Sequence, residues 1–273
     1  MNERPIGMLD SGVGGLSILR QIRRAFASED VLFFADQAHV PYGARPLHEV
    51  RSFSEGIVRF LLDQGSKLIV VACNTASAAA LRHLRSVFPQ IPFVGMEPAV
   101  KPAAEATRTR RVGVLATPAT FQGELFASVV ERFASGVRIL PQTLPGLVER
   151  IEAGDLNGPA TRAILEGAIR PLVEQGVDTL VLACTHYPFV IPLIREVAGP
   201  QVRVIDPSPA IARQTERLLR QHGLEAPTNR RGAVALISSG SPAHLAEMAR
   251  RLSGEAWPTL PAAWQGDGLR IAI

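Results

Sequence analysis

Cysteine, lysine and aromatic residues are scarce in this chain of 273 residues. It has two cysteines, Cys73 and Cys184, and two lysines, Lys67 and Lys101, and only 5% of its residues are aromatic. Two cysteines without paired histidines are too few for a zinc site, which takes four protein ligands or three and a water, so we expect no metal. Two such cysteines are also more typical of reduced thiols than of a disulfide.

The scarcity of lysine argues against one common kind of cofactor. A pyridoxal phosphate enzyme holds its cofactor through a Schiff base to a lysine. Lys67 precedes a predicted strand and Lys101 lies in a polar loop or at the start of a helix. Neither stands at the carboxyl end of a strand, where ligands bind in open parallel sheets. We therefore expect a mechanism without a cofactor.

Long apolar runs are also missing. No run reaches the roughly 18 residues that a membrane-spanning helix needs, and residues 1–5 lack the pattern of a secretory signal. The net charge is +4, but the basic residues are scattered over predicted helices and are not interleaved with aromatic residues. We therefore expect a cytoplasmic protein that binds neither a membrane nor a nucleic acid.

Short apolar runs alternate with stretches of helical periodicity along most of the chain. This alternation predicts an α/β fold with mainly parallel sheets. After the turn at 117–120, a helix is expected to about residue 133. A long helix is expected over 157–175, where Pro171 is able to introduce a kink. The tail over 257–273 shows no clear pattern. The predicted strands cover 6–10, 31–35, 68–72, 92–96, 111–116, 137–140, 179–183, 202–205 and 233–238.

The two halves of the chain repeat each other. Each cysteine stands eight residues after the glycine of a Gln-Gly pair, which ends at Gly65 in one half and Gly176 in the other. The cysteines are 111 residues apart, and an earlier strand recurs at a similar offset of 106 residues, from Gly7 to Gly113. A repeat of this kind predicts two pseudo-symmetric α/β domains with the active site in the cleft between them.

Polar residues repeat as well, because each cysteine ends a predicted buried strand and is followed by Asn74-Thr75 or Thr185-His186. If the halves face each other, both thiols reach one cleft, and the helix expected after each cysteine offers a positive end that lowers a thiol pKa. A racemase or epimerase removes a proton from one face of a carbon and returns one to the other, which two opposed thiols can do. Cysteine often only packs in a core, but two that recur at matching positions favour a shared site.

A glycine-rich turn, Asp10-Ser11-Gly12-Val13-Gly14-Gly15, follows the first predicted strand. It has the look of a phosphate-binding loop, but it lacks the lysine of a P-loop and the spacing of a dinucleotide fingerprint. The conformational needs of a tight strand-to-helix turn are enough to explain its glycines.

Four motifs closely resemble those of the glutamate racemases, in the aspartate/glutamate racemase superfamily, and the resemblance extends to about Leu252. They are the turn at 10–15, Pro41-Tyr42-Gly43, the segment 72–78 and the segment 184–188. The resemblance implies that the chain interconverts L- and D-glutamate without a cofactor, supplies D-glutamate for peptidoglycan and forms a homodimer. It also implies one domain of residues 1–97 with 208–273 and another of residues 98–207.

The same resemblance implies the roles of single residues. Cys73 deprotonates the D-isomer with help from Asp10, and Cys184 deprotonates the L-isomer with help from His186. Glu152 matches an assisting glutamate, although Glu149 lies close enough to compete. The substrate contacts implied are Asp10, Ser11, Pro41, Tyr42, Gly43, Asn74, Thr75, Thr117, Thr120, Thr185 and His186. Ala183 and Leu144 depart from the family pattern, and this bears on local packing more than on the thiols.

Three alternatives stay open at this point. One is an aspartate racemase, or one of broad specificity, of the same superfamily. Another is a non-catalytic protein that binds glutamate in a regulatory role. The third is a redox pair of thiols, which requires that the two sulfur atoms can bond directly.

Overall fold

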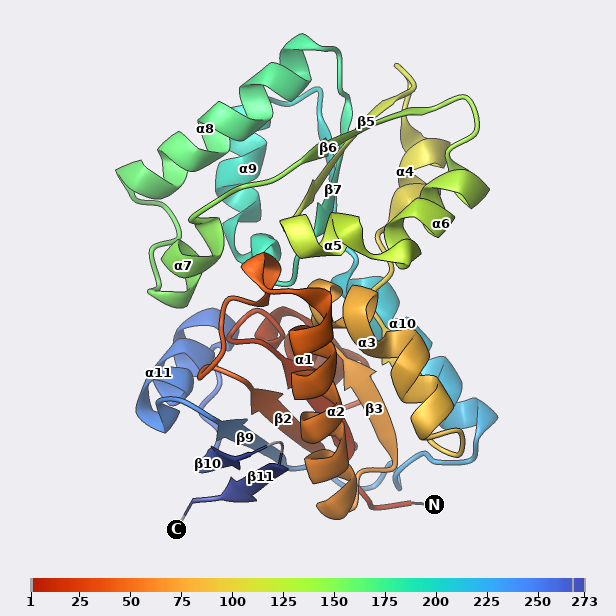
Figure 1. Ribbon diagram of the computed structural model, residues 1–273, viewed down its shortest axis with the longest axis vertical. Coiled ribbons are helices and arrows are strands. Elements are labelled where there is room, and N and C mark those ends of the chain that lie inside the picture. The colour runs from red at the N-terminus through yellow and green to blue at the C-terminus, as the bar shows by residue number, and fades with distance from the viewer. Residues whose placement is uncertain (1, 267, 273) are drawn as a thin grey trace.

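The strands of the protein form two separate sheets, one in each of two lobes (Figure 1). The computed structural model describes residues 2–266 and 268–272. The first lobe holds a seven-stranded sheet of order β11-β10-β9-β2-β1-β3-β4, and the second lobe a four-stranded sheet of order β6-β5-β7-β8. Every strand pair is parallel except β10 with β11. The predicted α/β fold with mainly parallel sheets is therefore confirmed. The strands are β1 (Ile6–Asp10), β2 (Val31–Ala35), β3 (Leu68–Val71), β4 (Phe93–Gly95), β5 (Arg111–Ala116), β6 (Arg138–Gln142), β7 (Thr179–Ala183), β8 (Arg203–Ile205), β9 (Val234–Ser238), β10 (Thr259–Gln265) and β11 (Gly268–Ile271).

Helices cover both faces of each sheet, which explains why the strands read as continuous apolar runs. In the first lobe, one face packs against α1 (Leu16–Ala25), α10 (Ser208–Gln221) and α11 (Pro242–Ser253), and the other against α2 (Leu47–Asp63) and α3 (Asn74–Val87). In the second lobe, one face packs against α7 (Leu147–Glu152), α8 (Pro159–Glu174) and α9 (Ile191–Ala198), and the other against α4 (Val100–Ala106), α5 (Pro118–Gln122) and α6 (Glu124–Phe133). Two short 3-10 helices are η1 (Tyr42–Ala44) and η2 (Tyr187–Val190).

The internal repeat has a direct counterpart in the two sheets. The order β2-β1-β3-β4 in the first lobe is the order β6-β5-β7-β8 in the second. The repeated Gln-Gly pairs end α2 and α8, and the glycines that follow, Gly65 and Gly176, have φ angles of +85° and +82°. This left-handed conformation closes a helix and strongly favours glycine. The predicted pseudo-symmetry is thus confirmed down to the residues that end equivalent helices.

Both cysteines lie just past the carboxyl ends of equivalent strands, β3 and β7. Side chains alternate along a strand, so Cys73 shares the face of Ile69 and Val71 that packs on α2 and α3. Cys184 shares the face of Leu180 and Leu182 that packs on α7, α8 and α9. The carboxyl ends of both sheets point to the boundary between the lobes (Figure 1).

One local expectation was wrong. The helix expected to residue 133 is broken at Gly123, which is extended (φ −73°, ψ 141°) and where an added Cβ would lie 2.7 Å from Ala78 of the first lobe. Cys184 is followed by the short η2 and then by α9, as expected for a helix after this cysteine. The long helix expected over 157–175 is confirmed as α8, which runs from Pro159 to Glu174 and contains Pro171. Much of the unpatterned tail forms β10 and β11, with β10 paired to β9.

The chain passes between the lobes twice, between β4 and α4 and between β8 and α10. These passages agree with the division into residues 1–97 with 208–273 and residues 98–207, which we keep as a proposal. In the part of the chain that the structure describes, no helix combines the length and apolarity needed to cross a membrane.

Candidate active site

Cys73 lies at the amino end of α3 and is buried. Its Sγ accepts a hydrogen bond from the backbone N–H of Ala76 at 3.5 Å. Burial raises the pKa of the Cys73 thiol well above its ordinary value, and the nearby Asp10 carboxylate raises it further. The donors from Ala76 and Ser11 offset only part of this effect. The amino end of α3 does lower this pKa, through the Ala76 N–H, but desolvation of the thiolate outweighs this one weak backbone contact.

Cys184 has a different set of partners. Its Sγ lies 3.7 Å from Nδ1 of His186, and Nε2 of the same imidazole lies 2.6 Å from Oε1 of Glu152. Burial lowers the pKa of His186, but the bonds to Cys184 and Glu152 outweigh burial and hold it well above its usual value. The imidazole is thus kept charged beside the sulfur, an arrangement that stabilises a thiolate.

Glu152 is the glutamate that reaches this imidazole. Its Oε1 also accepts the backbone N–H of Val13 at 2.8 Å, so the carboxylate joins the second lobe to the first. Burial raises the pKa of Glu152, but the bonds from His186 and Val13 bring it below its ordinary value. Glu149 is exposed on the same helix. The contact therefore favours Glu152 over Glu149 as the assisting carboxylate.

Asp10 stands at the end of β1 and makes a second bridge between the lobes. Its Oδ1 accepts the N–H of Gly12 at 2.9 Å, and its Oδ2 accepts the hydroxyl of Thr185 at 3.0 Å. Burial raises the pKa of Asp10 to about 6, against a lowering by the charge of His186. Asp10 can therefore exchange a proton close to neutral pH, beside Cys73.

Three threonine hydroxyls meet where the lobes face each other. Thr75 Oγ1 lies 2.9 Å from Thr117 Oγ1 and 3.3 Å from Thr120 Oγ1, and the last two are 2.9 Å apart. Thr75 belongs to α3, whereas Thr117 and Thr120 belong to α5 and its N-cap. Gly43 lies against this group, because an added Cβ would come within 2.6 Å of Thr117. These residues, far apart in sequence, form one polar wall.

Asn74 adds an amide with unused bonding capacity. Among the described residues, neither its side-chain nitrogen nor its side-chain oxygen has a hydrogen-bond partner, although both atoms are buried. Buried polar groups without partners are costly and uncommon. An amide in this state next to Cys73 is suited to bind a polar ligand.

The glycines of the turn after β1 have a different purpose from the one expected. Gly12 and Gly14 both lack a positive φ. An added Cβ would lie 1.9 Å from Oε1 of Glu152 at Gly12, and 2.5 Å from Oγ1 of Thr185 at Gly14. Glycine is required here because the second lobe approaches the backbone closely, and not because the turn needs an unusual backbone conformation.

Tyr42 and Pro41 lie beside the cleft. The Tyr42 hydroxyl donates to Oδ2 of Asp36 at 2.5 Å, and burial raises its pKa well above the ordinary value. Asp36 also accepts from Ser239 and from Trp264 of β10, at 2.7 and 2.8 Å. The sequence shows Asp36 only as a polar strand end, so this supporting role was missed.

Pro41 lines a hollow of about 450 Å³ next to the cleft, together with Glu152 and His244. His244 of α11 places Nε2 2.9 Å from the backbone oxygen of Glu152. No motif marks His244 in the sequence, and it was missed as well.

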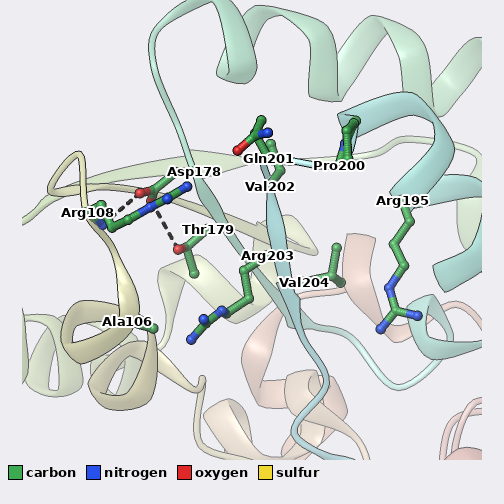
Figure 2. Close-up of a pocket in the computed structure, with 11 residues that line it drawn as sticks. Ala106, Arg108, Asp178, Thr179, Arg195, Pro200, Gln201, Val202, Arg203 and Val204 are labelled. Atoms are coloured by element: carbon green, nitrogen blue, oxygen red, sulfur yellow. Dashed lines mark hydrogen bonds between the residues drawn. The ribbon is translucent and has the colours of Figure 1, made fainter.

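Another hollow, of about 540 Å³, lies at the opposite end of the second sheet (Figure 2). It lies around the amino ends of β7 and β8, next to Asp178 and Arg203. Asp178 accepts bonds from the Arg108 backbone and the Thr179 hydroxyl. This hollow has no thiol or imidazole in its lining, and we do not assign the site to it. Within residues 2–266 and 268–272, no group of three or more metal-ligating side chains is arranged to hold an ion.

Comparisons with known proteins point to one family of racemases. Residues 6–215 match the model of the Asp/Glu/hydantoin racemase family. The chain is 52% identical over 259 residues to a glutamate racemase of Pseudomonas aeruginosa, covering 95% of this chain and 93% of that protein. The solved glutamate racemase of Francisella tularensis in complex with D-glutamate superposes with a TM-score of 0.84 at 26% identity, covering 97% and 98% of the two chains. The solved glutamate racemase of Escherichia coli, in complex with L-glutamate and the activator UDP-MurNAc-ala, superposes with a TM-score of 0.83 at 31% identity. The match covers 98% of this chain and 99% of that chain.

Proposed function

The chain belongs to the Asp/Glu/hydantoin racemase family as a glutamate racemase, and we propose that it interconverts L- and D-glutamate by passing protons through Cys73 and Cys184 without a cofactor. One observation carries this mechanism: the only two thiols of the chain follow equivalent strands and meet the boundary between the lobes, each beside its own acid/base partner. The relatives solved with D-glutamate and with L-glutamate support glutamate as the substrate.

In the direction from L to D, the Cys184 thiolate takes the proton from Cα, and the Cys73 thiol delivers a proton to the opposite face. The raised pKa of Cys73 suits it to hold that proton. The charged imidazole of His186 stabilises the thiolate at Cys184, and Glu152 holds the imidazole. In the reverse direction the roles exchange, and Asp10 receives the proton that Cys73 must first lose.

The polar wall provides the remaining contacts. The unpartnered amide of Asn74 and the hydroxyls of Thr75, Thr117 and Thr120 bind the carboxylate groups of glutamate in this proposal. Ser11, Gly43 and Thr185 complete the wall. The Tyr42 hydroxyl is engaged by Asp36, so Tyr42 contributes through its backbone and by holding η1 in place. Pro41 contributes by shaping the same turn.

The cellular role follows as a further part of the proposal. D-Glutamate made by this reaction would supply peptidoglycan synthesis, and the activator UDP-MurNAc-ala in the Escherichia coli structure is consistent with such a link for that relative. A cytoplasmic location and a homodimer are also proposed, the homodimer on the family resemblance, and both stand apart from the chemistry of the cleft.

The test uses the purified chain with no added cofactor and each enantiomer of glutamate and aspartate in turn. We expect racemisation of both enantiomers of glutamate, followed by circular dichroism, and exchange of the Cα hydrogen with deuterated water. Faster turnover of aspartate would reassign the substrate. Binding of glutamate without any exchange would replace the enzyme by a binding protein.

A further inference from the structure

We propose that His244 is a positioning residue for proton transfer at Cys184 and that it acts through Glu152. The inference rests on the proposed function of Cys184 as an acid/base thiol. His244 lies on α11 of the first lobe, whereas Glu152 is the last residue of α7 in the second lobe. Nε2 of His244 lies 2.9 Å from the backbone oxygen of Glu152. We assign this nitrogen as the donor because a carbonyl oxygen only accepts.

The end of α7 depends on contacts of this kind. The helix has six residues, too few to be stable by itself in water. The chain turns after α7. There the N–H of Ala153 donates a hydrogen bond to the backbone oxygen of Glu149, and the N–H of Gly154 donates one to the backbone oxygen of Ile151. The last carbonyls of a helix lack partners inside the helix. His244 supplies the partner for Glu152, at the residue whose side chain holds His186.

Packing offers little to replace this bond. The hollow of about 450 Å³ is lined by Val148 and Glu149 of α7, by Ala153 just after this helix, and by Ser241 and His244 of the first lobe. Without His244, Glu152 is held mainly through its carboxylate, by Val13 and His186. That carboxylate would then have to position the backbone as well as hold the imidazole.

The effect should fall on one thiol. Cys184 is connected to His244 through His186 and Glu152, while Cys73 has its bonds from Ala76 and Ser11, which lie on the other side of the cleft. Loosening Glu152 weakens the support of the charged imidazole and hence of the Cys184 thiolate. Proton transfer to and from Cys184 should become slower, and this step should limit the rate more than in the wild type.

The experiment compares His244→Ala, His244→Gln and His222→Ala. Glutamine keeps a side-chain N–H donor, and His222 is an exposed histidine of the same lobe that follows α10. For His244→Ala we expect kcat to fall by about tenfold, the effect of losing one well-placed hydrogen bond. The primary isotope effect with α-deuterated L-glutamate should rise. His244→Gln should recover most of kcat, and His222→Ala should match the wild type.

A second readout does not depend on racemisation. Iodoacetamide labelling with peptide mapping measures the reactivity of each thiol, and we expect slower labelling of Cys184 and unchanged labelling of Cys73 in His244→Ala. An unchanged kcat, isotope effect and labelling pattern would overturn the inference. So would an equal loss in His244→Ala and His244→Gln that follows a common drop in melting temperature. A wild-type chain that does not racemise glutamate would instead refute the proposed function, and the labelling would still test His244.

Discussion

The two thiols occupy equivalent positions in the two lobes but have different neighbours. Cys73 caps a 14-residue helix and lies near the carboxylate of Asp10, which raises its pKa. Cys184 precedes a short 3-10 helix and lies beside the imidazole of His186, which Glu152 holds. The comparison shows that the repeat places two sulfur atoms at equivalent positions, while differences between the halves give each sulfur atom different neighbours.

The differences can be read position by position. His186 stands where the first half has Thr75, and the hydroxyl of Thr75 bonds to threonines of the opposite lobe instead of a carboxylate. Asp10 corresponds to Ala116 at the offset of 106 residues, so the second half has no carboxylate there. One thiol thus lies beside an anion and the other beside a cation. This difference favours a protonated thiol at Cys73, whose pKa is raised by burial and by Asp10.

Removing either thiol should have the largest effect. In Cys73→Ala and Cys184→Ala, we expect racemisation to fall by about 10³-fold or more, because each enantiomer needs one base and one acid. The comparison predicts more: Cys73→Ala should still exchange the Cα hydrogen of L-glutamate with deuterated water, and Cys184→Ala that of D-glutamate. NMR follows this exchange. Full racemisation by either variant would break the two-thiol mechanism.

The substitution Glu152→Gln should have the next largest effect on racemisation. Glutamine keeps the size of the side chain but not the charge that holds the imidazolium of His186. A hydrogen bond to a charged group contributes about 1.5–3 kcal/mol, so we expect kcat to fall by about 10- to 100-fold. Glu149→Gln is the matched control and should leave kcat unchanged, since Glu149 is exposed. If the two variants lose activity equally, the assignment of Glu152 is wrong.

The pKa of Asp10 makes a prediction about stability. A pKa raised from 3.8 to about 6 means that the folded state holds this proton more tightly than the unfolded chain. The corresponding stabilisation is complete below pH 3.8 and is lost as the pH rises through about 6. At 1.36 kcal/mol per pH unit, the loss is about 3 kcal/mol.

Asp10→Asn should therefore gain stability relative to the wild type between about pH 4 and pH 6, because asparagine has no proton to lose. Urea unfolding at a series of pH values measures the difference, and groups common to both proteins cancel. A difference that does not change with pH across this range would show that Asp10 ionises in the folded protein as in the unfolded chain.

Substitutions of glycine by alanine should have the smallest effects. They should show whether a glycine is needed because another lobe lies close to its backbone or because of the geometry of the turn. In Gly12→Ala, the new Cβ meets Glu152, and we expect a cost of about 1–3 kcal/mol together with reduced activity. Gly167→Ala is the control, because Gly167 lies exposed in α8 with nothing within 4 Å of an added Cβ. The free energy of unfolding of Gly167→Ala should be higher than that of the wild type by about 0.5–1 kcal/mol. Thermal unfolding measures both, and a harmless Gly12→Ala would contradict the close contact.

The sequence predicts the sheets and the positions of the two thiols well because both depend on local patterns. Alternating apolar runs predict parallel strands, and the repeated Gln-Gly pairs predict equivalent helix ends at Gly65 and Gly176. Contacts between distant segments leave no such pattern. Asp36 with Trp264, and Glu152 with His244, are joined only in three dimensions. The break at Gly123 likewise depends on Ala78 of the other lobe, so helical periodicity alone misses it.

The order of the strands along the chain has a consequence for synthesis on the ribosome. The second lobe is one continuous stretch that can fold as soon as it has emerged, since domains tend to fold as units from the amino end. The first lobe is interrupted by it, and β2 pairs with β9, which is translated after the entire second lobe. Until then the edge of β2 is open and can pair with other chains. A nascent chain of this kind should benefit from a chaperone that shields that edge, even though the finished protein has it covered.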